Sequence, residues 1–340
     1  MTETKMPAPP TQSRRRQLPR QLLPSAGLDR FSGLYLLVLL TVIYSLLESS
    51  TFFTGENFRI VLSSQAITGI ITLGLMVSLI CGVFDLSIAA NMTWAVLFVG
   101  YLQEHGWNWV LAVILTVLTG AVIGVLNAVV VTWLHVDSVI GTLGMSSVLA
   151  AISYWLTSGQ AVTTGIQSGF ISFGNYQIAT IPLPVYFFAV IAVALWYFLN
   201  YRPSGRYLYA VGSNMTAARL AGLKVMRLQW TGLIASATVA SFAGAVFAAQ
   251  LGNSPSDAGS PYLLPAFSAA FLGATQVRPG RFNVWGTVIA IYLLAIGVKG
   301  LELKWPADSW ISDLFEGLVL IVAVALAVQS SNRRRTARKS

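Results

Sequence analysis

The side chains of this protein that could do chemistry are isolated polar residues set among long apolar runs. Asp85 lies in CGVFDLSIAANMTW, residues 81–94, closely followed by Ser87 and Asn91. A carboxylate or hydroxyl at the start of a helix can accept the free N–H groups of its first turn, which would be a structural cap. Alternatively, the chain breaks between two helices here, and Asp85, Ser87, Asn91 and Thr93 are candidates for lining a solute path. The sequence leaves both interpretations open.

Two further polar residues raise the same choice. Asn127 is a lone amide in LTGAVIGVLNAVVV, where such an amide more often joins helices than binds a solute. Gly120 and Gly124 have a spacing typical of close helix packing. Asn253 belongs to residues 249–274, AQLGNSPSDAGSPYLLPAFSAAFLGA, whose prolines exclude a straight helix facing lipid. This segment is either an external loop or a partly re-entrant wall of a translocation route, with Asn253 on the path.

Several kinds of chemistry have no signature in the chain. The sequence contains no GxxxxGK[ST] phosphate loop, no HExxH and no GxSxG motif. One cysteine, Cys81, provides neither a disulfide nor a Cys-based metal site. Asp85 and, at helix edges, Lys299 and Glu316 are the ionisable residues that come closest to the interior of the apolar runs. Intramembrane enzymes and ion-coupled carriers usually carry such residues well inside their helices. We therefore expect no catalytic residue, metal or cofactor on this chain, and a pathway for a neutral solute powered from elsewhere.

The elements that position these residues are predicted to be membrane-spanning helices. Of the 340 residues, 55% are hydrophobic and 10% charged, whereas a soluble domain carries about 25% charged residues. Apolar stretches of about 17 to 25 residues can cross a bilayer as helices. The sequence predicts an all-α polytopic membrane protein with about ten spans: 31–49, 60–80, 88–103, 108–133, 138–157, 182–199, 229–250, 262–275, 284–300 and 309–328.

The basic residues predict which side is cytoplasmic. Ten spans put both termini on one side, and every Lys and Arg except Arg59, Lys299 and Lys304 then falls in a segment on that side. This asymmetry explains the net charge of +9 without a nucleic acid partner. We expect a cytoplasmic basic tail over 1–30, a transmembrane domain over 31–329 with a cytoplasmic loop at 200–228, and a second basic tail over 330–340.

One polar segment interrupts the apolar pattern, GRYLYAVGSNMTAARLAGLKV at residues 205–225. Ser213 or Asn214 can cap a short helix over 215–221, which Gly222 would end in the left-handed conformation. Such a helix is too short to be stable alone in water, so it must lie against a partner. Its small residues favour a protein groove over the lipid surface: Ala217, Ala218 and Ala221.

Three stretches in register carry a resemblance to a known family. DLSIAAN, GRYLYAVGSNMTAARLAGLKV and AGSPYLLPAFSAAFLGATQVRPGRFNVWGT resemble the sugar-type ABC transporter permeases, the ribose-importer membrane subunits and their relatives. The similarity runs from about residue 31 to 328. It implies a subunit of a bacterial importer in the inner membrane, which pairs with a second permease subunit, either a copy or a paralogue. It also implies a periplasmic binding protein that delivers solute, and a cytoplasmic ATPase that binds ATP and Mg.

The same resemblance assigns roles to residues. It implies that 214–222 is the coupling helix that docks on the ATPase, with these residues matching or lying within the pattern: Gly212, Asn214, Ala217, Ala218, Arg219, Leu220 and Gly222. The sequence departs from the family pattern at Met215, where an acid is common, and at Leu264, Pro265 and Lys299. The solute therefore stays unnamed. The alternatives are a branched-chain amino-acid permease of the same superfamily and, further away, an ion-coupled secondary carrier.

Overall fold

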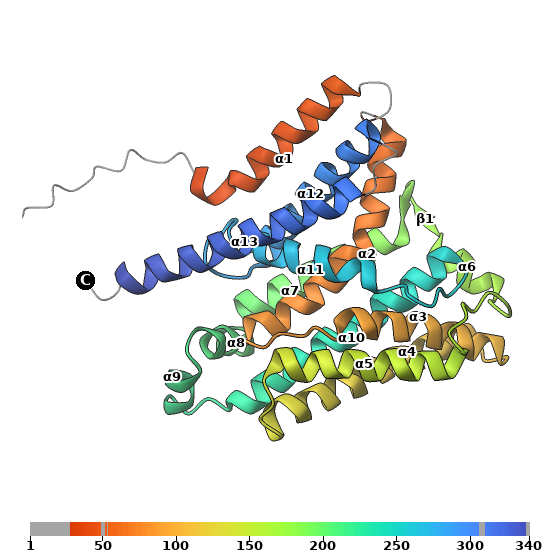
Figure 1. Cartoon of the computed structure of the whole chain (residues 1–340), viewed down its shortest axis with the longest axis horizontal. Coiled ribbons are helices and arrows are strands. Elements are labelled where there is room, and N and C mark those ends of the chain that lie inside the picture. The colour runs from red at the N-terminus through yellow and green to blue at the C-terminus, as the bar shows by residue number, and fades with distance from the viewer. Residues whose placement is uncertain (1–27, 49–51, 53, 306–309, 338–340) are drawn as a thin grey trace, which may run out of the picture.

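The computed structural model describes residues 28–48, 52, 54–305 and 310–337, and most of these residues are helical (Figure 1). The described elements, in chain order, are α1 (Leu28–Leu47), α2 (Gly55–Ile80), α3 (Ile88–Glu104), α4 (Trp109–Ala128), the π-helix η1 (Val129–Trp133), α5 (Ser138–Thr157), α6 (Ser168–Gly174), the antiparallel strands β1 (Gln177–Ile178) and β2 (Ile181–Pro182), α7 (Leu183–Tyr201), α8 (Pro203–Ser213), α9 (Met215–Leu220), α10 (Val225–Leu251), α11 (Ser260–Gly273), α12 (Val284–Lys304) and α13 (Trp310–Ala337). The predicted helical fold class is confirmed.

Every predicted span coincides with one helix or, for 108–133, with α4 and η1 together. Within the described residues, six helices are long and apolar enough to cross a membrane: α2, α4 with η1, α5, α7, α10 and α12. The apolar part of α1 is shorter, α3 has 17 residues and α11 has 14. The chain is therefore a multi-pass membrane protein, and the count of ten spans stays a prediction.

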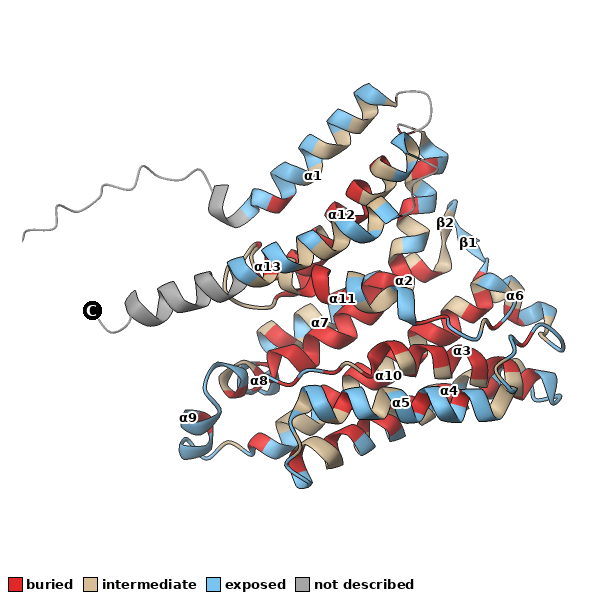
Figure 2. Cartoon of the chain, in the orientation of Figure 1, coloured by how far each residue is buried: buried red, intermediate tan, exposed pale blue. Residues whose placement is uncertain are grey.

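Helix α10 packs against α2, α3 and α4 at the centre of the bundle, where burial is concentrated (Figure 2). Glycines allow this close approach. A Cβ atom on Gly124 of α4 would lie 2.6 Å from the Cα of Ile234, and one on Gly120 would overlap Ser241 Oγ. Because lipid gives no hydrophobic force between helices, such close van der Waals contact holds the bundle together. The predicted packing role of Gly120 and Gly124 is confirmed.

The chain unwinds between α2 and α3. Helix α2 ends at Ile80, and Gly82 adopts a left-handed conformation with φ of 77°. The N–H groups of Gly82 and Val83 donate to the carbonyls of Leu79 and Ser78, which satisfies two carbonyls at the helix end. The backbone then stays non-helical until α3 begins at Ile88. This connection, residues 81–87, contains Asp85 and Ser87.

A second irregular stretch, residues 252–259, runs along α3 before α11 begins. Ser254 pairs with Val162 at one end of the bundle and lies against Gly100 of α3. Further along, the Gly259 N–H donates to Thr93 Oγ1 at 2.9 Å. The segment thus lies along α3 instead of projecting outward, which favours the interpretation as a re-entrant wall over that as an external loop. Helix α11 is about 21 Å long, which is shorter than a bilayer core of roughly 30 Å.

The first part of the predicted cytoplasmic loop at 200–228 is itself a helix, α8. Pro203 begins it, and it buries Gly205, Leu208 and Val211 against the bundle. These positions recur every three residues and therefore lie on one side of α8. The helix is stabilised by packing this side against other segments, which the local sequence does not reveal. The α8–α9 segment lies at the opposite end of the molecule from the β-hairpin and α6 (Figure 1).

The start of α1 and the end of α13 lie toward the end of the molecule that carries α8 and α9 (Figure 1). Of the two predicted basic tails, residues 1–27 and 338–340 lie outside the described residues. Helix α13 continues to Ala337, so most of the predicted tail at 330–340 is an extension of the last helix.

Candidate functional site

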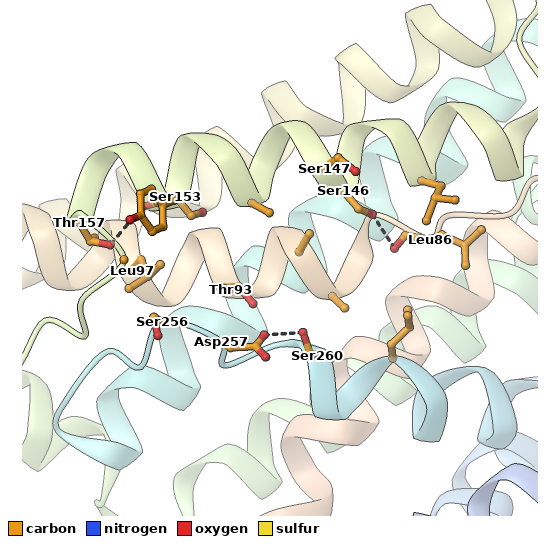
Figure 3. Close-up of a pocket in the computed structure, with 17 residues that line it drawn as sticks. Leu86, Thr93, Leu97, Ser146, Ser147, Ser153, Thr157, Ser256, Asp257 and Ser260 are labelled. Atoms are coloured by element: carbon orange, nitrogen blue, oxygen red, sulfur yellow. Dashed lines mark hydrogen bonds between the residues drawn. The ribbon is translucent and has the colours of Figure 1, made fainter.

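A cavity of about 600 Å³ lies between α3, α5 and the stretch that leads into α11 (Figure 3). This volume is typical of small-molecule sites. Small and hydroxyl-bearing residues dominate its lining, which comprises Leu86, Ala89, Ala90, Thr93, Leu97, Leu143, Ser146, Ser147, Ala150, Ser153, Tyr154, Thr157, Gly159, Ser256, Asp257, Ser260 and Leu263. Such a wall offers a few hydroxyl groups, set among apolar surface, to a polar, uncharged molecule.

The irregular stretch before α11 shapes one side of the cavity. Gly259 allows it to approach α3, because a Cβ atom there would overlap the carbonyl oxygen of Ala89. The carboxylate of Asp257 accepts a hydrogen bond from the Ser260 hydroxyl at the first residue of α11 (Figure 3). Among the described residues that line the cavity, Asp257 is the one charged side chain, and none is Lys, Arg or His.

The hydroxyl of Ser153 is a second distinctive feature of the lining. The residue is 4% exposed, and its Oγ has no hydrogen-bond partner among the described residues. Buried polar groups are normally paired. Ser153 belongs to the cavity wall but its Oγ is itself buried, so a change of its χ1 rotamer would bring the hydroxyl to a molecule inside.

Four predicted path residues are instead fully buried between helices. The Asp85 carboxylate accepts hydrogen bonds from the Ser87 N–H and hydroxyl, at 3.1 and 2.6 Å, and from the Ser236 hydroxyl of α10, at 2.7 Å. Ser87 Oγ in turn accepts from Asn127 Nδ2 of α4 at 2.7 Å. Asp85 therefore stabilises the turn before α3 and joins that turn to two other helices, but no side chain caps the first turn of α3 itself, so the capping interpretation is wrong in that detail.

Asn91 extends this network along α3. Its Nδ2 donates to the carbonyl oxygen of Ala237 at 2.8 Å, and its Oδ1 accepts from the Ser241 hydroxyl at 2.9 Å. Asp85, Ser87, Asn91 and Asn127 are each 0% exposed, and none of them lines the cavity. The buried network, defined here as these four residues with Ser236 and Ser241, thus holds α3, α4 and α10 together.

The two remaining path candidates lie in different places. Thr93 lines the cavity, whereas Asn253 is exposed and lies outside the lining. Sequence reasoning missed the part of the wall that comes from α5, which contributes seven of the 17 lining residues. The signal was present as a series of Ser and Thr residues in 138–157, several of them at helical spacing on one side: Ser138, Thr142, Ser146, Ser153 and Thr157.

The α9 segment has the predicted local geometry. The side chain of Asn214 caps the helix by accepting the Ala217 N–H at 2.9 Å, and Gly222 is left-handed with φ of 79°. Ala218 is 5% exposed and packs with Val211 and Val225 in a small core of the loop. The predicted outward contact of Ala218 is therefore wrong, because this side chain faces inward.

The outer surface of α9 is exposed and partly apolar. Leu220 is 86% exposed and Met215 38%, while Ala217 and Arg219 are also exposed. An apolar side chain as open as Leu220 on a helix of six residues suggests a surface that a partner covers. Gly212 does not belong to this surface, since it lies against the end of α2.

Helix α8 is fixed to the turn between α11 and α12. The Tyr209 hydroxyl donates to the carbonyl oxygen of Phe282 at 2.7 Å, and the guanidinium of Arg281 stacks 3.5 Å above the Tyr209 ring. Burial raises the pKa of Tyr209 although Arg281 acts in the opposite direction, so the phenol stays protonated and can donate. The α8–α9 segment is thus supported by the bundle and presents α9 outward.

Comparison with known proteins identifies the family. Residues 57–324 match the family described as "Branched-chain amino acid transport system / permease component". The ribose import permease protein of Escherichia coli (strain K12) is 29% identical over 311 residues, 91% of this chain and 95% of that protein. Its counterpart in Bacillus subtilis (strain 168) is 32% identical over 300 residues, 88% and 92% of the two chains.

A third relative and one solved structure extend the comparison. The autoinducer 2 import system permease protein of Klebsiella pneumoniae is 30% identical over 264 residues, 75% of this chain and 78% of that protein. A metal-chelate-type ABC transporter in an inward-facing conformation has a TM-score of 0.50 at 16% identity, covering 87% of this chain and 97% of that chain. This last similarity concerns the fold alone. The sequence relatives confirm the resemblance drawn from the three stretches.

Proposed function

We propose that this chain, which belongs to the family of permease components of branched-chain amino acid transport systems, carries a neutral, hydroxyl-rich solute. It is a multi-pass permease subunit of an ABC importer in the bacterial inner membrane. The family description leaves sugars and amino acids both open, whereas the relatives named above carry ribose and autoinducer 2. The solute class must be argued from the cavity.

The lining of the cavity is the observation that carries this proposal. An amino acid is a zwitterion, and its carboxylate needs a basic residue or a helix N-terminus as partner. No Lys, Arg or His is found among the described lining residues, and Asp257 already occupies the position beside the start of α11. The hydroxyls of α5 that line the cavity can accept hydrogen bonds from the hydroxyls of a sugar while they donate to backbone carbonyls of the protein. The cavity therefore suits a sugar or sugar-like compound better than a branched-chain amino acid.

The α9 surface supports an ATP-driven mechanism. The chain has no phosphate loop, so the hydrolysis of ATP, with its Mg, belongs to a separate cytoplasmic ATPase. In this proposal the ATPase covers Leu220, Arg219 and Ala217, and a second permease subunit and a periplasmic binding protein complete the importer. The solute then passes by alternating access, which requires nucleotide to bind the two states of the complex with different affinity.

The topology proposed here has ten crossings and both termini in the cytoplasm. The irregular stretch at 252–259 and α11 together make one of the crossings, and the basic residues of α8 and α9 then lie in the cytoplasm. Discontinuous helices beside a binding site are a recurring feature of transporters. Asp85, Ser87, Asn91 and Asn127 act in this arrangement by holding the helices that border the path.

Uptake by the complete importer tests the solute class. The permease, the ATPase and the binding protein encoded beside it would be reconstituted in liposomes, with radiolabelled ribose and leucine as probes. ATP-dependent entry of ribose or of a competing sugar or polyol supports the proposal. Entry of leucine instead would establish the amino-acid alternative, and uptake in cells that collapses with a protonophore while ATP is maintained would establish a secondary carrier.

Substitution on α9 tests the coupling surface. Leu220→Asp places a charge where the ATPase is proposed to pack, so ATP-dependent uptake and co-purification of the ATPase should both be lost. Arg219→Glu should also abolish coupled uptake while the permease still inserts in the membrane. Ala218→Trp would instead disrupt the small core of the loop, so it is not a probe of the contact. Normal uptake by Leu220→Asp and Arg219→Glu would refute the role of α9.

A further inference from the structure

The connection between α2 and α3, residues 81–87, touches both regions that the proposed function uses. Near its start the backbone contacts α8, which continues into α9, and near its end Leu86 lines the cavity. If the importer works as proposed above, the first region receives movement from the ATPase and the second borders the solute. The contacts along the connection show how the two could be joined.

At the α8 end, backbone lies directly against backbone. A Cβ atom on Gly212 would overlap the last carbonyl oxygen of α2, that of Ile80, and a Cβ atom on Gly82 would lie 3.4 Å from the Gly212 Cα. No flexible side chain separates the two segments. A displacement of α8 must therefore push the end of α2 and the start of the connection directly, because close-packed groups cannot absorb it.

At the cavity end, three hydroxyl residues of α5 hold the connection. The Phe84 N–H donates to Ser138 Oγ at 3.2 Å, and the Leu86 N–H donates to Thr142 Oγ1 at 3.0 Å. The Ser146 hydroxyl donates to the Leu86 carbonyl oxygen at 3.1 Å (Figure 3). Their four-residue spacing places all three hydroxyls on one face of α5.

Helix α5 is free enough to follow such a movement. Its membrane-length window is 17% buried, against 67% for α10. The Ser146 hydroxyl is also 3.0 Å from the carbonyl oxygen of Thr142 on its own helix. Since a hydroxyl has one proton, this second acceptor competes with Leu86, so the bond from the Leu86 N–H to Thr142 Oγ1 is the firmer link between the connection and α5. The later part of α5 contributes Ser147, Ser153 and Thr157 to the cavity wall.

The middle of the connection is fixed. The Asp85 carboxylate binds the Ser236 hydroxyl of α10 at 2.7 Å, so the connection is held to the central helix between its two contacts. It thus meets α8 on one side of this anchor and α5 on the other. A push at one contact would tilt the connection about Asp85 and move the other contact.

We propose that the α2–α3 connection transmits movement of the α8–α9 segment to α5 and so to the cavity. Gly212 is the contact that receives the movement, and Thr142 and Ser146 are positioning residues that pass it to α5. None of the three has to touch the solute or the ATPase for this role.

Accessibility of the cavity measures this transmission without knowledge of the solute. Ala150→Cys places a thiol in the cavity wall, and the native thiol of Cys81 is buried and gives the background. The rate of reaction with N-ethylmaleimide would be measured on the purified complex with its ATPase, without nucleotide and with ATP, Mg and vanadate. The proposed function predicts that trapping the complex with ATP, Mg and vanadate changes this reaction rate several-fold in Ala150→Cys, which serves as the parent for further substitutions.

Substitutions in that parent test the connection itself. Gly212→Ala and Thr142→Val should abolish the nucleotide-dependent change in rate, while co-purification of the ATPase is retained. Thr142→Ser keeps the hydroxyl and should restore the change. Gly55→Ala is the matched control on α2, because a Cβ atom there meets nothing within 4 Å.

The possible results separate the two proposals. If Gly212→Ala does not assemble with the ATPase, the comparison of Thr142→Val with Thr142→Ser tests the transmission role on its own. A nucleotide-dependent change that persists in Thr142→Val, or that is lost equally in Thr142→Ser, overturns the transmission role. If the thiol of the Ala150→Cys parent reacts at the same rate with and without nucleotide, the result counts against the proposed function instead.

Discussion

Asp85 and Asp257 carry the same side chain in opposite surroundings. Asp85 is 0% exposed and accepts three hydrogen bonds within the buried network, whereas Asp257 is exposed at the cavity and accepts one from Ser260. The same contrast holds for the amides and hydroxyls around them. Polar residues of this bundle therefore serve two separate purposes: those of the network join helices, and those of the cavity are proposed to face the solute.

The difference shows that the face of a helix decides the role of a polar residue. Asn91 and Thr93 are two positions apart on α3, which corresponds to a rotation of about 200° around the helix axis. Asn91 consequently points to α10 and Thr93 to the cavity. Residue type predicted both as path residues, but rotation assigns them to different regions.

The largest expected effect is that of Asp85→Ala. The substitution leaves the Ser87 N–H and the hydroxyls of Ser87 and Ser236 without their acceptor inside the bundle, at a cost on the order of 3 kcal/mol. We expect a marked fall in the melting temperature of the detergent-solubilised protein, measured by fluorescence-detected size exclusion, together with loss of uptake.

Asp257→Ala is the matched comparison at the cavity. Its stability should change by no more than about 0.5 kcal/mol, since the residue is exposed. Uptake of the ribose probe should show a KM raised by about tenfold, because a charge-assisted hydrogen bond is worth roughly 1.5 kcal/mol or more. A melting temperature lowered as much as in Asp85→Ala would break the distinction between the two regions.

The sequence predicted the helices well because long apolar runs and their interruptions are local features. The spans predicted at 88–103 and 138–157 agree with α3 and α5 to within a residue. The capped helix α9 was equally predictable from Asn214 and Gly222, which act within one turn. Helix α8 was missed because its stability rests on burying Leu208 and Val211 against other segments.

The candidate site was predicted less well for a physical reason. The cavity is formed by three segments distant in the sequence, and its wall depends on the rotation of α3 and α5 about their axes. The sequence favoured a role for Asn127 in joining helices, and this is confirmed because its Nδ2 donates a hydrogen bond to Ser87 Oγ. Asp257 was absent from the predicted path because an acid in a Ser- and Pro-rich stretch is typical of a loop.

The amides of the network give a smaller effect, graded by their hydrogen bonds. Asn91 makes two, to Ala237 and Ser241, whereas Asn127 makes one and its Oδ1 has no partner among the described residues. Asn91→Ala should therefore lose about 2 kcal/mol of stability and Asn127→Ala about 1 kcal/mol. Melting temperatures of the two variants test this order. The reverse order would mean that the Asn127 contact to Ser87 is worth more than both contacts of Asn91.

The smallest expected effect on stability comes from replacing one serine by alanine in each region. The two replacements should differ in the direction in which they change the stability. Ser241→Ala removes the donor to Asn91 Oδ1 and should destabilise the protein by about 1 kcal/mol. Ser153→Ala removes a buried hydroxyl that has no partner in the described part of the chain, so stability should stay the same or rise slightly.

Transport should respond in the opposite way to stability in this pair. Ser153 faces the cavity, so Ser153→Ala should raise the KM for the ribose probe a few-fold with the maximal rate little changed, because a binding contact is lost. Ser241→Ala, at constant amounts of folded protein, should leave KM unchanged since Ser241 lies outside the lining. If Ser153→Ala instead lowered the melting temperature and left KM unaltered, its hydroxyl would belong to the packing of α5, and the cavity would lose one of its solute contacts.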